Sequence, residues 1–243
     1  MKNIDILGVN IQTLNKKQIL QKIEYFLSDG KQYFITTPNP EIILKAQKDK
    51  EFLNILNKAD LAIPDGIGLK FAGFAMFKNI HRITGADLIK DILQIAKDKI
   101  FKVAIANCNN GLSNITDIEK VIKEKYKNLD FIVEDISREI ENWKFKIENL
   151  ADFKPDILIS TLGAPWQEKF IYSAMPKLSS VKIGIGVGGA FDFLTGKAKR
   201  APKIMRILGL EWLWRLVKQP KRIKRIYNAV IVFPLKFLKW RLK

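Results

Sequence analysis

Cysteine and histidine each occur only once in this chain of 243 residues. Because Cys108 is alone, no internal disulfide can form, and nothing in the sequence requires an oxidising compartment. A single histidine, His81, excludes a metal site built from several histidines. The chain also contains no Asp-x-Asp motif, no Walker sequence and no zinc-ligand spacing. The sequence therefore gives no reason to expect a metal site or a disulfide framework.

Long apolar runs are also missing. No window holds the run of about 20 apolar residues that a membrane-spanning helix needs. The longest candidate, residues 226–235, is interrupted by Asn228 and Pro234. Residues 1–8 predict a strand rather than a signal peptide, because their apolar run is short and contains Asp5. We therefore expect a cytoplasmic protein that does not cross the membrane.

Acidic residues are scarce near the C-terminus. From Lys197 onward there are 15 Lys and Arg residues and one acid, Glu211, whereas the first 196 residues carry 27 basic and 24 acidic residues. Such an uneven distribution implies an anionic partner, which can be lipid headgroups, nucleic acid or phosphates. We therefore divide the chain into a body, residues 1–196, and a basic tail, residues 197–243.

Within the body, short runs rich in Ile, Val and Phe alternate with amphipathic stretches. The runs predict strands at residues 32–36, 61–63, 101–106, 131–133, 157–160 and 181–185. Helices are expected between them, at residues 13–27 with Thr13 as the cap, from Pro40, from Thr84, at 110–125 and at 137–150. This alternation predicts an α/β fold, with a Rossmann-like, mostly parallel sheet and helices on both faces.

The tail predicts two helices, at residues 203–219 and 221–233, with Pro220 and Pro234 after them. In the second helix Ile223, Ile226, Tyr227 and Val230 share one face, while basic residues occupy the other. That pattern, with three tryptophans nearby, is typical of a helix that lies in a membrane surface. Two alternatives stay open, namely a helix that packs on the body and one that packs between subunits of a homo-oligomer.

Polar residues follow the predicted strands, where open α/β sheets bind ligands. Thr37 and Asn39 come after the second strand, and Asn39 is also a good helix cap. Asp65 follows the third strand and precedes Gly66, so the backbone there can approach a ligand closely. A carboxylate at this position can accept a proton from an attacking hydroxyl, although a simple helix cap is an equal alternative.

Further candidates lie in three later segments. Arg82 places a permanent cation just before a helix start, which favours a diphosphate, although a surface ion pair is the ordinary role of such an arginine. Gly163 and Gln167 belong to a compact loop after the fifth strand. These positions would provide an amide and a close backbone approach to a ligand.

A glycine-rich run follows the last predicted strand. It contains Gly186, Gly188, Gly189 and Asp192, and it formally matches G-x-G-x-x-G. A nicotinamide-binding motif is a poor explanation, because no βαβ unit follows and no strand-end acid appears about 20 residues further on. We interpret the run as a wall against a nucleotide, with Asp192 able to bond ribose or base. Close packing of backbone layers is the alternative.

Taken in order, these blocks closely resemble the WecG/TagA/CpsF glycosyltransferases over most of the chain. The resemblance is carried by residues 37–41, 59–66, 82–85 and 162–168, and most distinctively by 186–192, 196–197, 200–202 and 209–216. One segment departs from the family pattern. Where members usually have a Leu-Gly-Gly-like turn after the fourth strand, this chain has Asn107-Cys108-Asn109-Asn110.

The resemblance implies an inverting, metal-independent transferase with no cofactor. Its TagA-like members move N-acetylmannosamine from a UDP-sugar to undecaprenyl-diphosphate-linked N-acetylglucosamine in teichoic acid synthesis. WecG-like members move N-acetylmannosaminuronic acid. The family's base matches Asp65, and its other site residues match Thr37, Asn39, Arg82 and Gln167. Its C-terminal appendage carries arginines for the membrane and the active site, and these match Arg215, Arg222 and Arg225.

We therefore expect a peripheral enzyme on the inner face of the cell membrane that uses a UDP-sugar and a polyprenyl-diphosphate-linked acceptor. In this hypothesis Asp65 is the base, and Arg82 with the tail arginines offsets the charge of the departing UDP. The tail would bind an anionic membrane rather than nucleic acid. A basic nucleic-acid-binding protein and a nicotinamide-dependent enzyme are the alternatives.

Overall fold

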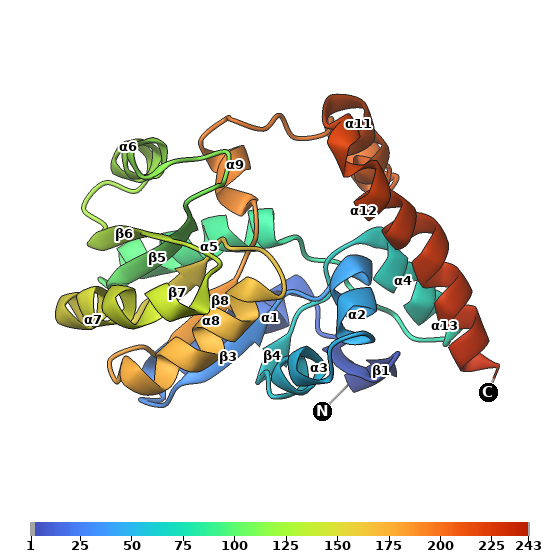
Figure 1. The fold of residues 1–243 in the computed structure, drawn as a ribbon, viewed down its shortest axis with the longest axis horizontal. Coiled ribbons are helices and arrows are strands. Elements are labelled where there is room, and N and C mark those ends of the chain that lie inside the picture. The colour runs from blue at the N-terminus through green and yellow to red at the C-terminus, as the bar shows by residue number, and fades with distance from the viewer. Residues whose placement is uncertain (1–2, 243) are drawn as a thin grey trace.

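Six parallel strands form the central sheet, in the order β4-β3-β8-β7-β5-β6 (Figure 1). The structure is a computed structural model of the chain and describes residues 3–242. The strands are β3 (Tyr33–Thr36), β4 (Leu61–Ala62), β5 (Val103–Cys108), β6 (Phe131–Ile136), β7 (Ile157–Ser160) and β8 (Ile183–Gly186). Residues of β5, β7 and β8 are buried throughout, as expected for parallel strands that are covered on both faces. The predicted Rossmann-like sheet is confirmed.

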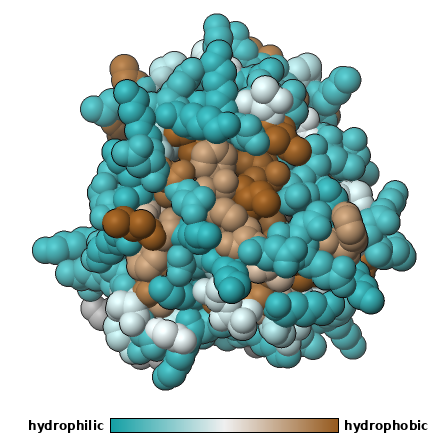
Figure 2. Space-filling model, turned by 90° about the vertical axis from the view of Figure 1, so that its left-hand side faces the viewer, coloured by the Kyte–Doolittle hydropathy of each residue, from teal (hydrophilic) through white to brown (hydrophobic). Residues whose placement is uncertain are grey.

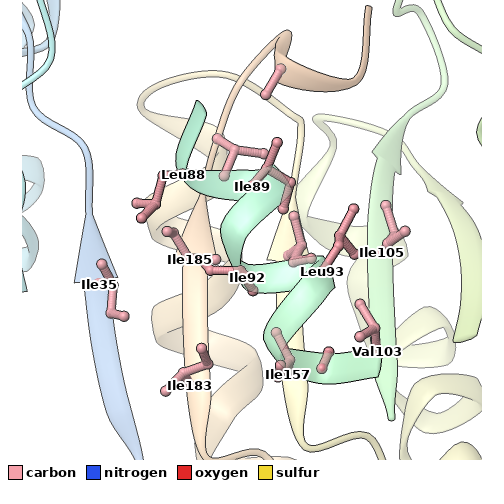
Figure 3. Packing of buried hydrophobic residues seen from close by; sticks show 14 of the residues in the cluster. Ile35, Leu88, Ile89, Ile92, Leu93, Val103, Ile105, Ile157, Ile183 and Ile185 are labelled. Carbon is pink, nitrogen blue, oxygen red and sulfur yellow. The ribbon is translucent and has the colours of Figure 1, made fainter. Parts of the chain in front are cut away.

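Helices cover both faces of the sheet. Alternate strand residues point to opposite sides, so that Ile157 and Ile159 pack with α5 while Leu158 packs with α7 and α8. Figure 3 shows α5 lying across the strands through Leu88, Ile89, Ile92 and Leu93. The body helices are α1 (Lys16–Ser28), α2 (Pro40–Ala46), α3 (Lys50–Asn57), α4 (Ile67–Ala75), α5 (Gly85–Asp98), α6 (Ile115–Lys125), α7 (Trp143–Phe153), α8 (Trp166–Ala174) and α9 (Ala190–Leu194).

Several element boundaries differ from the prediction. The cap of α1 is Asn15 rather than Thr13, because Asn15 and Gln18 bond each other's backbone N–H groups in a capping box. The helix expected from residue 110 begins at Ile115, and the one expected from 137 begins at Trp143 after a 3-10 turn. The N-terminal strand is confirmed as β1 (Asn3–Ile6), and it forms an antiparallel hairpin with β2 (Val9–Gln12) outside the main sheet.

The tail forms more helices than the sequence predicted. The single helix expected at 203–219 is two helices, α10 (Lys203–Ile207) and α11 (Glu211–Lys218), because the chain turns at Gly209, whose φ is +75°. The expected end at Pro234 is also wrong. After α12 (Ile223–Tyr227), a π-helical segment (Asn228–Val232) leads into α13 (Phe233–Arg241). Pro234 lies in the first turn after this wider segment, which accommodates a proline inside a longer helix.

The last tail helix packs on the body. Phe233 and Phe237 are fully buried and join the apolar cluster that contains Leu69 and Ala72 of α4. In Figure 1, α12 and α13 run along the side of the molecule next to α2 and α4, with α11 at their upper end. Packing on the body thus holds for Phe233, at the end of the helix expected at 221–233, and for Phe237 beyond it, whereas Ile223 and Tyr227 of the expected apolar face are exposed. None of the helices within residues 3–242 combines the length and hydropathy that a bilayer crossing requires.

Candidate active site

A cavity of about 490 Å³ opens at the carboxyl edge of the sheet. Loops after the strands, with the first turns of α8 and α9, contribute its polar floor, which includes Thr37, Asn39, Asp65, Asn110, Arg138, Thr161, Gly163, Gln167, Gly188, Gly189 and Asp192. The tail contributes the opposite wall, which includes Lys197, Lys199, Trp214, Arg215, Lys218, Arg222 and Arg225. The structure thus brings most of the strand-end candidates and the three tail arginines together around one cavity.

The electrostatic character of this cavity is cationic. Its lining contains eight Lys and Arg side chains against three carboxylates, those of Glu41, Asp65 and Asp192. Four of these cations have carboxylate partners. Arg225 and Lys45 contact Glu41 at 2.8 and 3.1 Å, Arg215 contacts Glu211 at 3.2 Å, and Lys197 contacts Asp117 at 3.0 Å. A concave surface with this excess of positive charge attracts anionic ligands such as phosphates.

A smaller cavity of about 180 Å³ adjoins the first. Seven residues line both cavities, namely Asn39, Glu41, Asp65, Thr84, Arg215, Arg222 and Arg225. The rest of the smaller cavity is largely apolar, and its lining includes Ile67, Trp212, Ile226, Ala229 and Val230. Asp65 and the three arginines therefore stand where a cationic cavity meets an apolar one.

Asp65 is held at this junction by the backbone. Its N–H donates to the carbonyl of Pro38 at 2.8 Å, which ties the loop after β4 to the loop after β3. Burial raises the pKa of Asp65, and nearby Glu211 raises it further, while the charges of Arg82 and Arg215 act in the opposite direction. A carboxylate with a raised pKa is a stronger proton acceptor than an ordinary aspartate, as a general base requires.

Thr37 and Asn39 take part in the local structure as well as in the cavity. The Thr37 hydroxyl donates to the carbonyl of Gly186 at 2.8 Å and so links the ends of β3 and β8. The Asn39 side-chain oxygen accepts the N–H of Ile42 at 3.0 Å, which confirms the helix cap expected there. Both residues nevertheless line the larger cavity, so capping and ligand contact do not exclude each other.

Gln167 connects the loop after β7 to the glycine run. Its side-chain oxygen accepts the N–H of Gly188 at 2.9 Å, and its amide donates to Glu168 at 2.7 Å. Glu168 is fully buried, and burial raises its pKa to about 7. A Cβ on Gly186 would lie only 2.7 Å from Gln167 atoms. Gly186 lines neither cavity, so the close-packing alternative describes it, whereas Gly188 and Gly189 reach the cavity.

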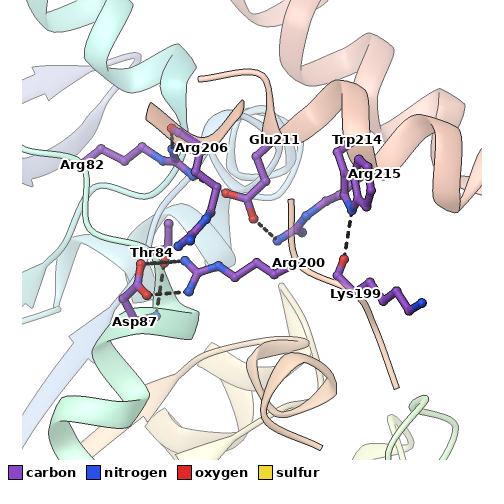
Figure 4. A network of polar contacts seen from close by, with 9 residues as sticks. All are labelled: Arg82, Thr84, Asp87, Lys199, Arg200, Arg206, Glu211, Trp214 and Arg215. Carbon is purple, nitrogen blue, oxygen red and sulfur yellow. Dashed lines mark hydrogen bonds and ion pairs between the residues drawn. The ribbon is translucent and has the colours of Figure 1, made fainter. Parts of the chain in front are cut away.

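Arginines and carboxylates join the tail to the body (Figure 4). Arg82 of the body contacts Glu211 of the tail at 2.6 Å, and Glu211 also contacts Arg215. Arg82 lines the smaller cavity only, whereas the predicted tail arginines line both. A second link is formed by Arg200, whose guanidinium bonds both carboxylate oxygens of Asp87.

Arg138 and Glu211 are among the residues of the site that the sequence did not point to. Arg138 follows β6 and lines the larger cavity, and it could have been found by examining the end of that strand as well. Glu211 is the sole acid of the tail, a visible signal, but its position between two arginines depends on the folded structure. Gly66 lines the smaller cavity, Gly163 and Asp192 line the larger one, and Asp192 accepts a hydrogen bond from Ser113 at 2.9 Å.

A parallel sheet with a cationic cavity and a half-buried carboxylate at its carboxyl edge is typical of an enzyme that acts on an anionic ligand. Residues 4–243 match the model of the glycosyl transferase WecG/TagA/CpsF family, and the chain belongs to this family. It is a glycosyltransferase. The family match covers nearly the entire chain, tail included, and it does not favour the nucleic-acid or nicotinamide alternatives.

Among similar proteins are two from Staphylococcus aureus, both named N-acetylglucosaminyldiphosphoundecaprenol N-acetyl-beta-D-mannosaminyltransferase. The protein of strain MRSA252 is 30% identical over 243 residues, which cover 99% of this chain and 94% of the relative. The protein of strain MW2 is 29% identical with the same coverage. The likeness therefore extends over both the body and the tail.

Proposed function

We propose that this enzyme transfers N-acetylmannosamine from a UDP-sugar to an N-acetylglucosamine unit carried on a polyprenyl diphosphate. The observation that carries the proposal is the place of Asp65, whose carboxylate lies where the cationic cavity meets the smaller, partly apolar one. The names of the Staphylococcus relatives support this donor sugar and acceptor. In our assignment the larger cavity binds the nucleotide-sugar, and the smaller one binds the diphosphate end of the acceptor.

The reaction is a single displacement at the anomeric carbon. The acceptor hydroxyl attacks this carbon and forms the new glycosidic bond, while the bond to the diphosphate oxygen breaks and UDP departs. The hydroxyl proton passes to Asp65, whose raised pKa suits it to this task. One displacement inverts the configuration at the anomeric carbon.

Arginines stabilise the departing diphosphate. Arg215, Arg222 and Arg225 line both cavities, so they can follow charge as it develops on the leaving group. Cations fixed in a site with little water contribute several kcal/mol to such a transition state. Arg82 acts from the smaller cavity, where Glu211 holds it beside Arg215. In this account the arginines replace a metal ion, and a chelator such as EDTA is expected to leave the rate unchanged.

Three polar side chains orient the sugars. Thr37 and Gln167 lie on the floor of the larger cavity, and Asn39 lies on the wall shared by both. Gln167 also fixes the backbone of Gly188, so that this loop can approach the nucleotide closely.

A product analysis tests the proposal directly. The purified protein is incubated with several UDP-N-acetylhexosamines, each in the presence of a water-soluble, short-chain diphosphate-linked N-acetylglucosamine. We expect one new product, larger than the acceptor by one N-acetylhexosamine, with UDP-N-acetylmannosamine as the best donor. Transfer from every donor at equal rates would contradict the donor assignment, and no transfer from any donor would contradict the reaction.

A further inference from the structure

Helix α4 of the body carries an unusual row of exposed aromatic residues. Phe71 is 47% exposed, Phe74 is 80% exposed, and Phe77, just beyond the helix, is 95% exposed. Only one other phenylalanine within residues 3–242 is exposed, namely Phe145 of α7. Exposed phenylalanines that gather in one short segment form an apolar patch, and such patches mark interaction surfaces.

This row lies beside the tail. The opposite face of α4 is buried through Leu69 against the tail helix α13. At its start, Ile67 packs closely on Gly209, in the turn between α10 and α11. A Cβ added to Gly209 would lie only 2.7 Å from an Ile67 carbon. Helix α10 and its C-cap residue add three more exposed apolar residues. We call the exposed apolar residues of α4, of α10 and just after each helix the α4–α10 patch: Ile67, Phe71, Phe74, Phe77, Ile204, Ile207 and Leu208.

Positive charge surrounds these apolar residues. Lys70, Lys78 and Lys203 are exposed on the same two segments. Neither residues 66–86 nor residues 193–210 contain an Asp or Glu. Apolar side chains flanked by lysines match a bilayer surface, where rings enter the acyl boundary and cations meet anionic headgroups. The opposite end of the molecule, which faces the viewer in Figure 2, also shows apolar residues among hydrophilic ones, but β6 at that end carries Glu134 and Asp135, whereas the α4 and α10 segments carry no acid.

We propose that the α4–α10 patch is a membrane-docking surface, so that the catalytic body contacts the bilayer directly in addition to the tail. The inference rests on the proposed lipid-linked acceptor and adds a site for its bilayer. Ile67 belongs both to the patch and to the wall of the smaller cavity. Docking through the patch therefore places the apolar side of that cavity next to the lipid phase, while Asp65 lines the same cavity where it meets the larger one.

A second copy of the chain is a weaker candidate for the occupant. Pairing through this patch would bring together two tails, each with a formal charge of +14. Like charges of that size repel at short range, whereas an anionic bilayer neutralises them.

The test compares three full-length proteins: wild type, Phe74→Ser/Phe77→Ser, and the control Phe145→Ser. Their binding to vesicles of equal parts phosphatidylglycerol and phosphatidylcholine is measured by co-sedimentation. Burial of one phenylalanine side chain in the bilayer raises the partition coefficient by about tenfold. The double variant should therefore bind vesicles at least tenfold more weakly than wild type, and the control should bind like wild type. This difference should persist at about 1 M salt, where the Debye length is roughly 3 Å and charge contributes little.

Two results would overturn the inference. One is equal vesicle binding by wild type and the double variant. The other is a wild-type dimer in light scattering that the double variant loses, since the patch would then be a contact between copies. Transfer to the water-soluble acceptor should stay normal in the double variant, because both rings lie outside the cavities. If the wild type transfers nothing to that acceptor, the proposed function fails while vesicle binding still decides the patch.

Discussion

At the scale of single residues, two buried carboxylates lie near the active site and have opposite environments. Glu211 sits between Arg82 and Arg215, and the arginines keep its pKa below the usual range despite its burial. Glu168 lacks such partners, because one of its oxygens has no hydrogen bond, and burial raises its pKa to about 7. The Glu211 carboxylate is therefore stabilised in its ionised form, whereas burial favours the protonated form of Glu168.

Substitution of Glu211 by Gln should cost stability. Removing the charge leaves Arg82 and Arg215 facing each other without their shared anion, and we expect the free energy of unfolding to fall by about 2 kcal/mol. Denaturant titration measures this change. The matched control is Glu119→Gln, which breaks the exposed Lys123–Glu119 pair and should cost less than about 0.5 kcal/mol. Equal losses in the two variants would contradict the role given to Glu211.

Glu168 should make stability depend on pH. Because its pKa in the folded protein, about 7, exceeds the ordinary 4.5, the folded state binds the proton more tightly than the unfolded chain does. The stability from this group is complete below pH 4.5 and is lost as the pH rises through 7, a loss of about 3 kcal/mol. Glu168→Gln removes the titration. Melting temperatures measured across this pH range should therefore fall more for wild type than for the variant, and parallel curves would refute the assignment.

At the scale of elements, the two ends of the tail are attached to the body by different kinds of contact. Near its start, Arg200 bonds Asp87 and Thr84 at the beginning of α5, and this contact lowers the pKa of Asp87 to about 2. At its end, Phe233 and Phe237 bury α13 in the body. Between these anchors, α11, the 3-10 turn Pro220–Arg222 and α12 carry the three arginines that line both cavities.

Loss of the first anchor should loosen only part of the tail. We expect Arg200→Gln to increase amide hydrogen exchange in α10 and α11 but not in α13, because α13 has its own apolar anchor. Phe237→Ala serves as the comparison. It should destabilise α13 and lower the free energy of unfolding by about 3 kcal/mol or more, because it leaves a cavity in a buried cluster. If amide exchange increased equally along the whole tail in both variants, the two ends of the tail would not be anchored separately.

The sequence predicts the strands of the sheet well, because their buried residues form short apolar runs. Residues of β5, β7 and β8 are buried throughout, as a parallel sheet covered on both faces demands, and β7 matches its predicted range in full. The tail was less predictable. Gly209 breaks one expected helix and the π-helical segment carries another past Pro234, and both outcomes depend on packing against α4 and α2. The strand-end candidates converged as expected, while the ion pairs of Glu211 depend on contacts between residues far apart in sequence.

At the scale of the whole molecule, the uneven charge of the sequence becomes a wall of the active site. The tail brings six of the eight cations that line the larger cavity. Binding of UDP should therefore weaken as salt is added, because mobile ions screen these charges. Calorimetry at low and high salt measures the effect, and an affinity for UDP that does not change with salt would contradict an electrostatic site. Uridine, which lacks the diphosphate, is the control and should show little salt dependence.

The central claim is that Asp65 accepts the proton of the acceptor hydroxyl at the meeting point of the two cavities. The most direct measurement is the turnover of Asp65→Asn, taken together with its affinity for UDP. The substitution preserves the size of the side chain and removes its basicity, so turnover should fall by about 10²–10⁴-fold while the Kd for UDP and the melting temperature change little. Turnover close to that of the wild type would contradict the role of Asp65 as the base.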